Sequence, residues 1–139
     1  MKYLIIGLGN VGRTLAEQLT DMGHDVIGVD TNEIRIDAVK DRISIAYILD
    51  ASHIEGLSEL PLDEVDTAIV AIGQSMEQSL RAVAALKELN IKRIYARAID
   101  NIHRTILKAM NINCIFTPET YAARLFAAKF TENIAEDLI

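Results

Sequence analysis

Short apolar runs alternate with longer amphipathic segments along the 139 residues of the chain. The run at residues 67–72, Thr-Ala-Ile-Val-Ala-Ile, is almost continuously apolar, as expected of a strand covered on both faces. Six such runs predict strands, at residues 2–6, 25–30, 43–49, 65–72, 92–98 and 112–116. Strands that alternate with helices favour a parallel sheet with helices on both of its faces.

The segments between the strands have the periodicity of helices. A helix is predicted over 11–22, ended by Gly23, and Thr31 or Asn32 is expected to cap another that runs to about residue 41. The first of these helices has apolar residues at spacings of four, four and three: Val11, Leu15, Leu19 and Met22.

Two further apolar stripes and a proline predict the helices of the second half. Helices are expected at 76–89, at 102–110 and from Pro118 to about residue 131. The stripes of the first two consist of Met76, Leu80 and Val83, and of Ile102, Ile106 and Met110. A short helix is expected between the third and fourth strands.

This order of elements predicts one Rossmann-like domain over residues 1–139, with a doubly wound six-stranded sheet. Since crossovers between parallel strands are right-handed, the expected strand order is 3-2-1-4-5-6. A ligand crevice is then expected where the strand order reverses, at the carboxyl ends of the first and fourth strands.

A glycine-rich segment lies between the first strand and the first helix. It has the form G-x-G-x-x-G and reads Gly7-Leu8-Gly9-Asn10-Val11-Gly12. The three glycines permit a tight turn, a close approach to a pyrophosphate and close packing of helix on strand. Asp30 ends the second strand, about twenty residues further on, where this fingerprint has a carboxylate for ribose hydroxyls. The pair predicts a nucleotide or dinucleotide site with a free ribose diol, because a carboxylate repels a 2′-phosphate.

The composition of the chain excludes several classes of function. The net charge is -6, and the basic residues are scattered, which argues against nucleic acid as the main partner. The lone cysteine, Cys114, is expected to be a small buried residue of the last strand in a protein of a reducing compartment. No leader-like segment follows Met1, and no apolar run approaches the length of a membrane span, so we expect a cytoplasmic protein without direct membrane insertion.

The sequence offers little that looks catalytic. His24, His53 and His103 share no metal-binding spacing, His24 is expected to be solvated, and no nucleophile motif occurs. The predicted Rossmann unit also occupies the whole sequence, which leaves no residues for a substrate domain. A ligand site without catalytic groups indicates a sensor rather than an enzyme.

Several short segments, in this order and spacing, resemble the RCK family, also called KTN or TrkA-N domains, over nearly the whole chain. The segments are Gly7-Leu8-Gly9-Asn10-Val11-Gly12, Gly23-His24-Asp25-Val26-Ile27-Gly28-Val29-Asp30, Asp50-Ala51-Ser52, Ala68-Ile69-Val70-Ala71-Ile72-Gly73, Ala96-Arg97-Ala98 with Asp100 and His103, and Thr117-Pro118-Glu119. The resemblance implies a nucleotide-sensing regulator of a potassium channel or transporter, peripheral on the cytosolic face of the membrane.

The resemblance also implies roles for single residues. Asp30 would hold the ribose diol, with Thr31 and Asn32 at the adenosine and Asp50 and Ala51 at the adenine edge. The other crevice positions it implies are Ala71, Ile72 and Gly73, with Arg97 at the phosphates. The alternative interpretation of Arg97 is a solvated basic residue at the end of a strand. The ligand implied is NAD(H) or an adenine nucleotide: ADP, ATP or AMP.

Four features depart from the family pattern or extend it. Asn10 replaces a basic residue of some triphosphate-binding relatives, which weakens the case for a triphosphate, and Asn111-Ile112-Asn113 replaces a common Gly-Ala-Asp. The second domain of many members has no counterpart here, so a fragment or a short member is expected. The place of Glu119 in Thr117-Pro118-Glu119 raises a metal role, although a first-turn glutamate also suits the helix dipole.

The last helix is expected at a subunit interface. Its apolar residues, among them Tyr121, Leu125 and Phe126, spread over more than one face. The resemblance implies that this helix crosses to a neighbouring subunit, and that the homodimer assembles into a ring beneath the pore. The alternatives are a helix that folds back on its own sheet and, for the function, an NAD-binding fragment of an oxidoreductase or a nucleotide-stabilised interaction module.

Overall fold

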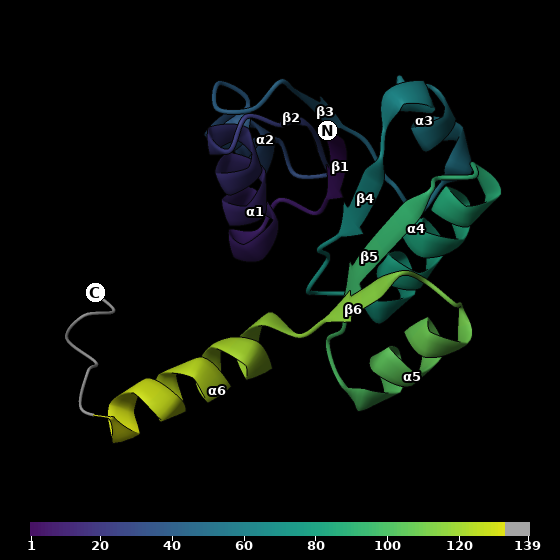
Figure 1. The fold of residues 1–139 in the computed structure, drawn as a ribbon. Helices are drawn as coiled ribbons and strands as arrows, with labels where there is room; N and C mark the ends of the chain where they lie inside the picture. Colours follow the sequence, from purple (N-terminus) through teal and green to yellow (C-terminus); the bar gives the residue numbers. More distant parts are fainter. Residues whose placement is uncertain (133–139) are drawn as a thin grey trace.

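Six parallel strands form one sheet in the computed structural model, which describes residues 1–132 (Figure 1). The strands are β1 (Lys2–Ile6), β2 (Asp25–Asp30), β3 (Ile45–Ile48), β4 (Thr67–Val70), β5 (Arg93–Arg97) and β6 (Cys114–Phe116). Their spatial order is β3-β2-β1-β4-β5-β6, which confirms the Rossmann-like architecture and the strand order predicted from the sequence.

Helices follow the strands in alternation. They are α1 (Asn10–Asp21), α2 (Glu33–Val39), α3 (Ile54–Ser58), α4 (Met76–Glu88), α5 (Asn101–Ala109) and α6 (Pro118–Thr131), with a 3-10 turn η1 (Leu62–Glu64) before β4. The Asn32 side chain caps α2 by accepting a hydrogen bond from the Ile34 N–H at 2.9 Å. Gly23 follows the C-terminal end of α1 with φ +92, a backbone conformation that glycine adopts readily after a helix.

The sheet has a separate apolar core on each face. On one side α1 and α2 pack on Ile5 and Val26, with Ala16, Ile36 and Val39 from the helices. On the other side α3, α4 and α5 pack on the larger cluster, through residues that include Leu57, Val83, Leu86 and Leu107. In Figure 1 the two groups of helices lie on opposite sides of the strands.

Two predicted helix stripes are rotated from the expected position. In α1 the buried residues are Gly12 and Ala16, and Met22 is 69% exposed, because the helix approaches the sheet through its smallest side chains. In α5 the buried residues are His103 and Leu107, and Ile102 is 67% exposed. The polar His103 is turned inward by its hydrogen bonds, which the pattern of apolar residues does not reveal.

Cys114 is exposed, so the prediction of a buried cysteine was wrong. It lies at the start of β6, a three-residue strand at the edge of the sheet that pairs only with β5. An edge strand has one neighbour, and its first residue is covered less than one in the middle of a sheet.

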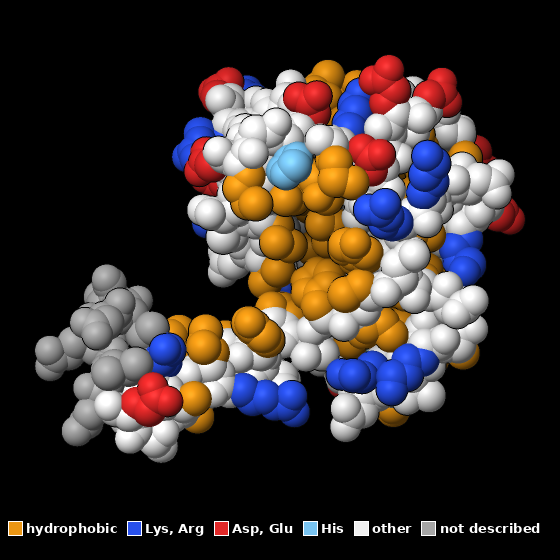
Figure 2. Space-filling model, in the orientation of Figure 1, with side chains coloured by type: hydrophobic (Ala, Val, Ile, Leu, Met, Phe, Trp, Pro, Cys, Tyr) orange, Lys and Arg blue, Asp and Glu red, His pale blue; other side chains and the backbone are white. Residues whose placement is uncertain are grey.

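The last helix extends away from the sheet instead of lying on it (Figure 1). None of the residues of α6 is buried, and Figure 2 shows hydrophobic side chains along it. The large exposed apolar residues of the helix are Tyr121, Leu125, Phe126 and Phe130, and the rings of Phe126 and Phe130 stack with their centroids 5.9 Å apart.

Candidate functional site

The glycine-rich turn joins β1 to α1 with the geometry that its three glycines predict. Gly7 has φ +94, a conformation that L side chains rarely adopt, and its N–H donates to the Val29 carbonyl at 2.9 Å. A Cβ on Gly12 would lie 1.7 Å from the Gly7 carbonyl oxygen, so α1 packs directly on the turn. Gly9 precedes α1 and supplies no side-chain cap, which leaves the first N–H groups of the helix directed at the crevice.

Asp30 ties the carboxyl end of β2 to this turn. Its Oδ2 accepts a hydrogen bond from the Leu8 N–H at 2.8 Å, and its Oδ1 accepts one from the Asn32 N–H at 2.9 Å. The Arg35 guanidinium lies 3.4 Å from the same Oδ2. Asp30 is 8% exposed, and its carboxylate is a structural acceptor as well as the acid of the candidate ribose site.

A cavity of about 370 Å³ lies at the carboxyl ends of the strands, between the halves of the sheet. This is the switch point between β1 and β4, where doubly wound sheets bind their ligands. The structure brings twelve of the predicted cofactor-binding residues to its walls: Gly7, Gly9, Asn10, Val11, Asp30, Thr31, Asp50, Ala51, Ala71, Ile72, Gly73 and Arg97. Glu119, the candidate metal residue, also lines the cavity.

Three of the predicted residues do not line the cavity. Leu8 is buried beneath it and contributes its N–H to Asp30, and Gly12 is a packing position. Asn32 caps α2 and is directed at that helix. Each of the three therefore supports the site without facing it.

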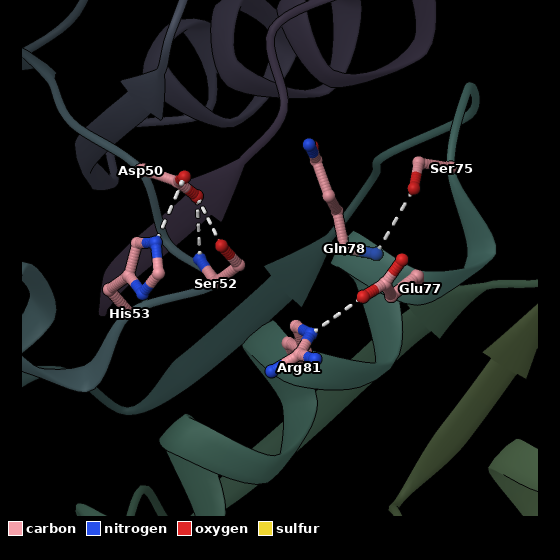
Figure 3. A network of polar contacts seen from close by, with 7 residues as sticks. All are labelled: Asp50, Ser52, His53, Ser75, Glu77, Gln78 and Arg81. Carbon is pink, nitrogen blue, oxygen red and sulfur yellow. Dashed lines mark hydrogen bonds and ion pairs between the residues drawn. The ribbon is translucent and has the colours of Figure 1, made fainter.

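Asp50 and Ser52 form a tight polar turn after β3 (Figure 3). Asp50 Oδ1 accepts hydrogen bonds from the Ser52 N–H at 2.9 Å and from the Ser52 hydroxyl at 2.6 Å, and Oδ2 lies 3.6 Å from Nε2 of His53. The Ser52 hydroxyl, followed by the Ser52 N–H, lowers the pKa of Asp50 below its ordinary value of 3.8. Asp50 is therefore a stable anion at one wall of the cavity.

The start of α4 forms the facing wall. Ser75 caps the helix by accepting a hydrogen bond from the Gln78 N–H at 3.1 Å. In Figure 3 the Gln78 side chain extends away from α4 into the space between this helix and the Asp50 turn. Its amide can donate and accept hydrogen bonds there. Glu77 and Arg81, which pair at 3.1 Å on the exposed side of α4, do not line the cavity.

Arg97 lies at the carboxyl end of β5. It is not a solvated basic residue, which was the alternative interpretation from the sequence. Its side chain is 17% exposed, and its guanidinium pairs with Glu119 in the first turn of α6. A Cβ on Gly73 would lie 2.6 Å from Nη1, so a larger residue at this position would require the guanidinium to move. Its Nε is buried without a hydrogen-bond partner among the described residues.

Seven lining residues were not predicted as ligand residues from the sequence: Ile6, Val29, Arg35, Leu49, Ser52, Gln74 and Gln78. Ser52 belongs to the Asp-Ala-Ser segment, whose first two residues were predicted to bind the ligand. Its hydroxyl, which can form hydrogen bonds, was the feature from which a ligand role could have been predicted. Arg35 and Gln78 come from helices, where the side-chain direction depends on how the helix is rotated. A pattern of apolar residues fixes that rotation only approximately.

The charged groups at the cavity are three carboxylates, of Asp30, Asp50 and Glu119, and two guanidinium groups, of Arg35 and Arg97. Within residues 1–132 no group of three or more His, Cys, Asp or Glu side chains is arranged to hold a metal ion. The metal role of Glu119 stays a prediction.

The strand order and the glycine turn define a Rossmann-like α/β domain with a crevice at its switch point. A family model of the TrkA-N domain matches residues 3–118, and the chain belongs to this family. The chain is 31% identical over 118 residues to Ktr system potassium uptake protein A of Vibrio alginolyticus and 32% identical to that of Bacillus subtilis. These alignments cover 85% of the chain but 54% and 53% of the relatives, so the chain spans about half of their length.

Solved structures share the fold at lower identity. The NAD(P)-binding domain of an exopolyphosphatase-related protein from Archaeoglobus fulgidus has a TM-score of 0.81 at 22% identity, covering 94% of this chain and 97% of that domain. The Kef C-terminal domain of Shewanella denitrificans in an AMP-bound form has a TM-score of 0.77 at 21% identity, covering 99% and 88%. The GsuK channel bound to NAD has a TM-score of 0.71 at 17% identity, covering 82% and 21%. In the described part of the chain, none of the helices is long and apolar enough to span a bilayer.

Proposed function

We propose that this chain is the nucleotide-sensing domain of a regulator of potassium transport. The observation that carries the proposal is the meeting of the glycine turn, Asp30 and Arg97 at one cavity. Membership of the TrkA-N family and the potassium uptake proteins among its relatives support the transport role.

The proposed ligand is NAD(H) or an adenine nucleotide. The residues of the cavity support such a ligand: Asp30 lines the cavity and would bind the ribose hydroxyls, and Gly9 lines it before α1, whose first N–H groups would bind phosphate. Asp50 and Ala51 would lie at the adenine edge, and Arg97 would bind phosphate oxygens through its guanidinium fork. The AMP and NAD ligands of the structural neighbours support this range of ligands.

The regulatory step would act through α6. Glu119 of this helix reaches the cavity and pairs with Arg97, so a ligand that competes for Arg97 changes how the base of α6 is held. A ligand shifts a conformational equilibrium only through unequal affinity for its two states, and competition with Glu119 for Arg97 would provide such a difference. We infer that ligands with different phosphate groups favour different arrangements of α6.

The proposed partners are a second copy of the chain and a membrane pore. The exposed apolar residues of α6 fit a crossover into a homodimer, with Tyr121, Leu125 and Phe126 covered by the other subunit. Dimers would assemble into a ring on the cytosolic face of a channel or transporter subunit. The role is regulatory, and no reaction is proposed for the cavity.

The test is potassium flux through the pore that the full-length protein controls. The full-length protein and the pore subunit from its gene neighbourhood are reconstituted together in vesicles, and flux is measured with and without NADH and ATP. We expect a nucleotide-dependent flux that is lost with Gly9→Ala and kept with Arg93→Ala, a variant at the opposite end of β5. Flux that does not respond to nucleotide, or a gene neighbourhood of metabolic enzymes only, contradicts the proposal and favours the oxidoreductase alternative.

A further inference from the structure

Arg35 occupies the position between the acid of the candidate ribose site and the glycine turn. Its Nη1 lies 3.4 Å from Asp30 Oδ2, and its guanidinium carbon lies 3.8 Å from the position that a Cβ on Gly9 would take. The guanidinium thus covers the face of Gly9, the glycine at which a phosphate approaches the backbone in this fingerprint. The side chain is 33% exposed and lines the cavity.

The glycine turn itself supplies no side-chain charge. Asn10, at the start of α1, is neutral, and the turn offers an anion only backbone N–H groups and the helix dipole. Of the described residues that line the cavity, only Arg35 and Arg97 are basic, and Arg97 is paired with Glu119 across the crevice. Arg35 therefore brings to the turn, from α2, a positive charge that the turn lacks.

Asp30 does not depend on Arg35 for its hydrogen bonds. Two backbone N–H groups already bind its two oxygens at 2.8 and 2.9 Å, whereas the contact with Arg35 is the longer one, at 3.4 Å. The guanidinium is therefore free to exchange this partner for a phosphate, which offers it two oxygens at once. When it leaves, a lone pair of Asp30 becomes available to a ribose hydroxyl.

We propose that Arg35 is the phosphate-binding side chain of the glycine turn, held beside Gly9 by Asp30 until a ligand arrives. The inference rests on the proposed nucleotide site and specifies how that site recognises the 5′-phosphate. Asp30 and Arg35 then act together, because the same event frees the acid for ribose and directs the base to phosphate.

The test compares adenosine, 5′-AMP and 2′-AMP as ligands of the chain in calorimetric titrations. Arg35→Ala is expected to weaken 5′-AMP binding by about tenfold or more, the scale of a lost charge-assisted hydrogen bond, and to leave adenosine binding unchanged or tighter. Arg42→Ala is the matched control, since Arg42 pairs with Glu17 and Asp21 on the outer surface. Arg35→Gln keeps a donor for Asp30 without the charge, and it carries the comparison if the alanine variant does not fold.

The outcomes separate this inference from the proposed function. Equal losses for adenosine and 5′-AMP mean a structural role for Arg35 and overturn the inference, as does unchanged 5′-AMP binding. A loss confined to 2′-AMP places the guanidinium at the ribose edge and also overturns it. A wild-type chain that binds none of the three ligands contradicts the proposed function itself, whereas wild-type binding that is the same for adenosine and 5′-AMP overturns the inference together with the phosphate role of Arg97.

Discussion

Arg97 and Glu119 form an ion pair that joins the carboxyl end of β5 to the first turn of α6. The pair connects the wall of the cavity to the helix that extends from the domain (Figure 1). The same guanidinium lies against Gly73, and its Nε has no partner among the described residues. The Arg97 guanidinium is therefore bound by Glu119 through one nitrogen, and its remaining N–H groups can donate hydrogen bonds to an anion.

The first prediction concerns this pair. Arg97→Ala is expected to weaken ADP binding by about 1.5–3 kcal/mol, because a charge-assisted hydrogen bond to phosphate is lost. Glu119→Gln is expected to strengthen it, because Arg97 is released and one carboxylate is removed from the cavity. Calorimetry without divalent cations measures both changes, with Arg93→Ala as the control on the same strand.

Weaker ADP binding by Glu119→Gln under these conditions would contradict the competition between Glu119 and phosphate. If instead the variant loses affinity only when Mg²⁺ is present, Glu119 acts through a metal ion, the role that its place in Thr117-Pro118-Glu119 raised as an alternative to a contact with the helix dipole.

The second prediction separates folding from binding within the glycine turn. Gly12→Ala is expected to destabilise the domain by about 1–3 kcal/mol or more, because its Cβ would overlap the Gly7 carbonyl oxygen. Gly9→Ala is expected to change the stability by only about 0.5 kcal/mol, since Gly9 has φ -69 and its nearest neighbour is an arginine side chain at 3.8 Å. The Gly9 methyl group would nevertheless occupy the approach of the phosphate.

Urea unfolding and NADH titration of the two variants check this assignment. Gly9→Ala should unfold at nearly the wild-type urea concentration and bind NADH much more weakly. Wild-type NADH binding by Gly9→Ala would mean that no phosphate approaches this glycine.

The sequence predicted the glycine turn and the acid of the site because both depend on residues that lie close together along the chain. An apolar run followed by spaced glycines predicts β1, the turn and α1 together, and Asp30 follows from its distance along the chain. Arg35 and Gln78 escaped prediction because both face the cavity from helices whose rotation is set by packing. Asn32 was predicted both as a possible cap of the second helix and as a ligand residue; the structure confirms the cap, and the ligand role stays a prediction.

The third prediction concerns pH. His103 is fully buried, its Nδ1 accepts a hydrogen bond from the Ile99 N–H at 2.9 Å, and its Nε2 lies 3.1 Å from the Ser79 hydroxyl. Because Nδ1 is an acceptor, the neutral ring with its proton on Nε2 fits this site, and burial lowers the pKa of His103 below its ordinary value of 6.5.

The direction in which the free energy of unfolding changes with pH follows from proton linkage. Below pH 6.5 the unfolded chain takes up a proton at this histidine before the folded chain does, so the free energy of unfolding falls as the pH drops. The slope from this single group is at most about 1.4 kcal/mol per pH unit. Urea unfolding between pH 7 and pH 5 measures it.

A matched pair of variants isolates the contribution of His103. His103→Asn keeps an acceptor for the Ile99 N–H and removes the titrating group, so it should flatten the pH dependence in this window. His53→Asn, at an exposed histidine, should leave that dependence intact. An equal slope in wild type and His103→Asn would show that the buried ring is not responsible.

The fourth prediction concerns assembly. Leu125 and Phe126 are 44% and 41% exposed on α6, and replacing both with Asp is expected to convert dimers or larger rings into monomers. Sedimentation at micromolar concentration measures the change. Arg124→Asp puts a similar charge at a neighbouring exposed position of α6 and should leave the assembly intact. A wild-type chain that sediments as a monomer would contradict the crossover of α6.

The central claim is that the crevice at the switch point binds a nucleotide, and calorimetric titration of the chain with NADH, AMP, ADP and ATP tests it most directly. We predict saturable binding of at least one of these ligands, with one ligand per chain, and loss of that binding in Gly9→Ala, which should still fold. The absence of saturable binding for all four ligands to the folded wild-type chain would contradict the account.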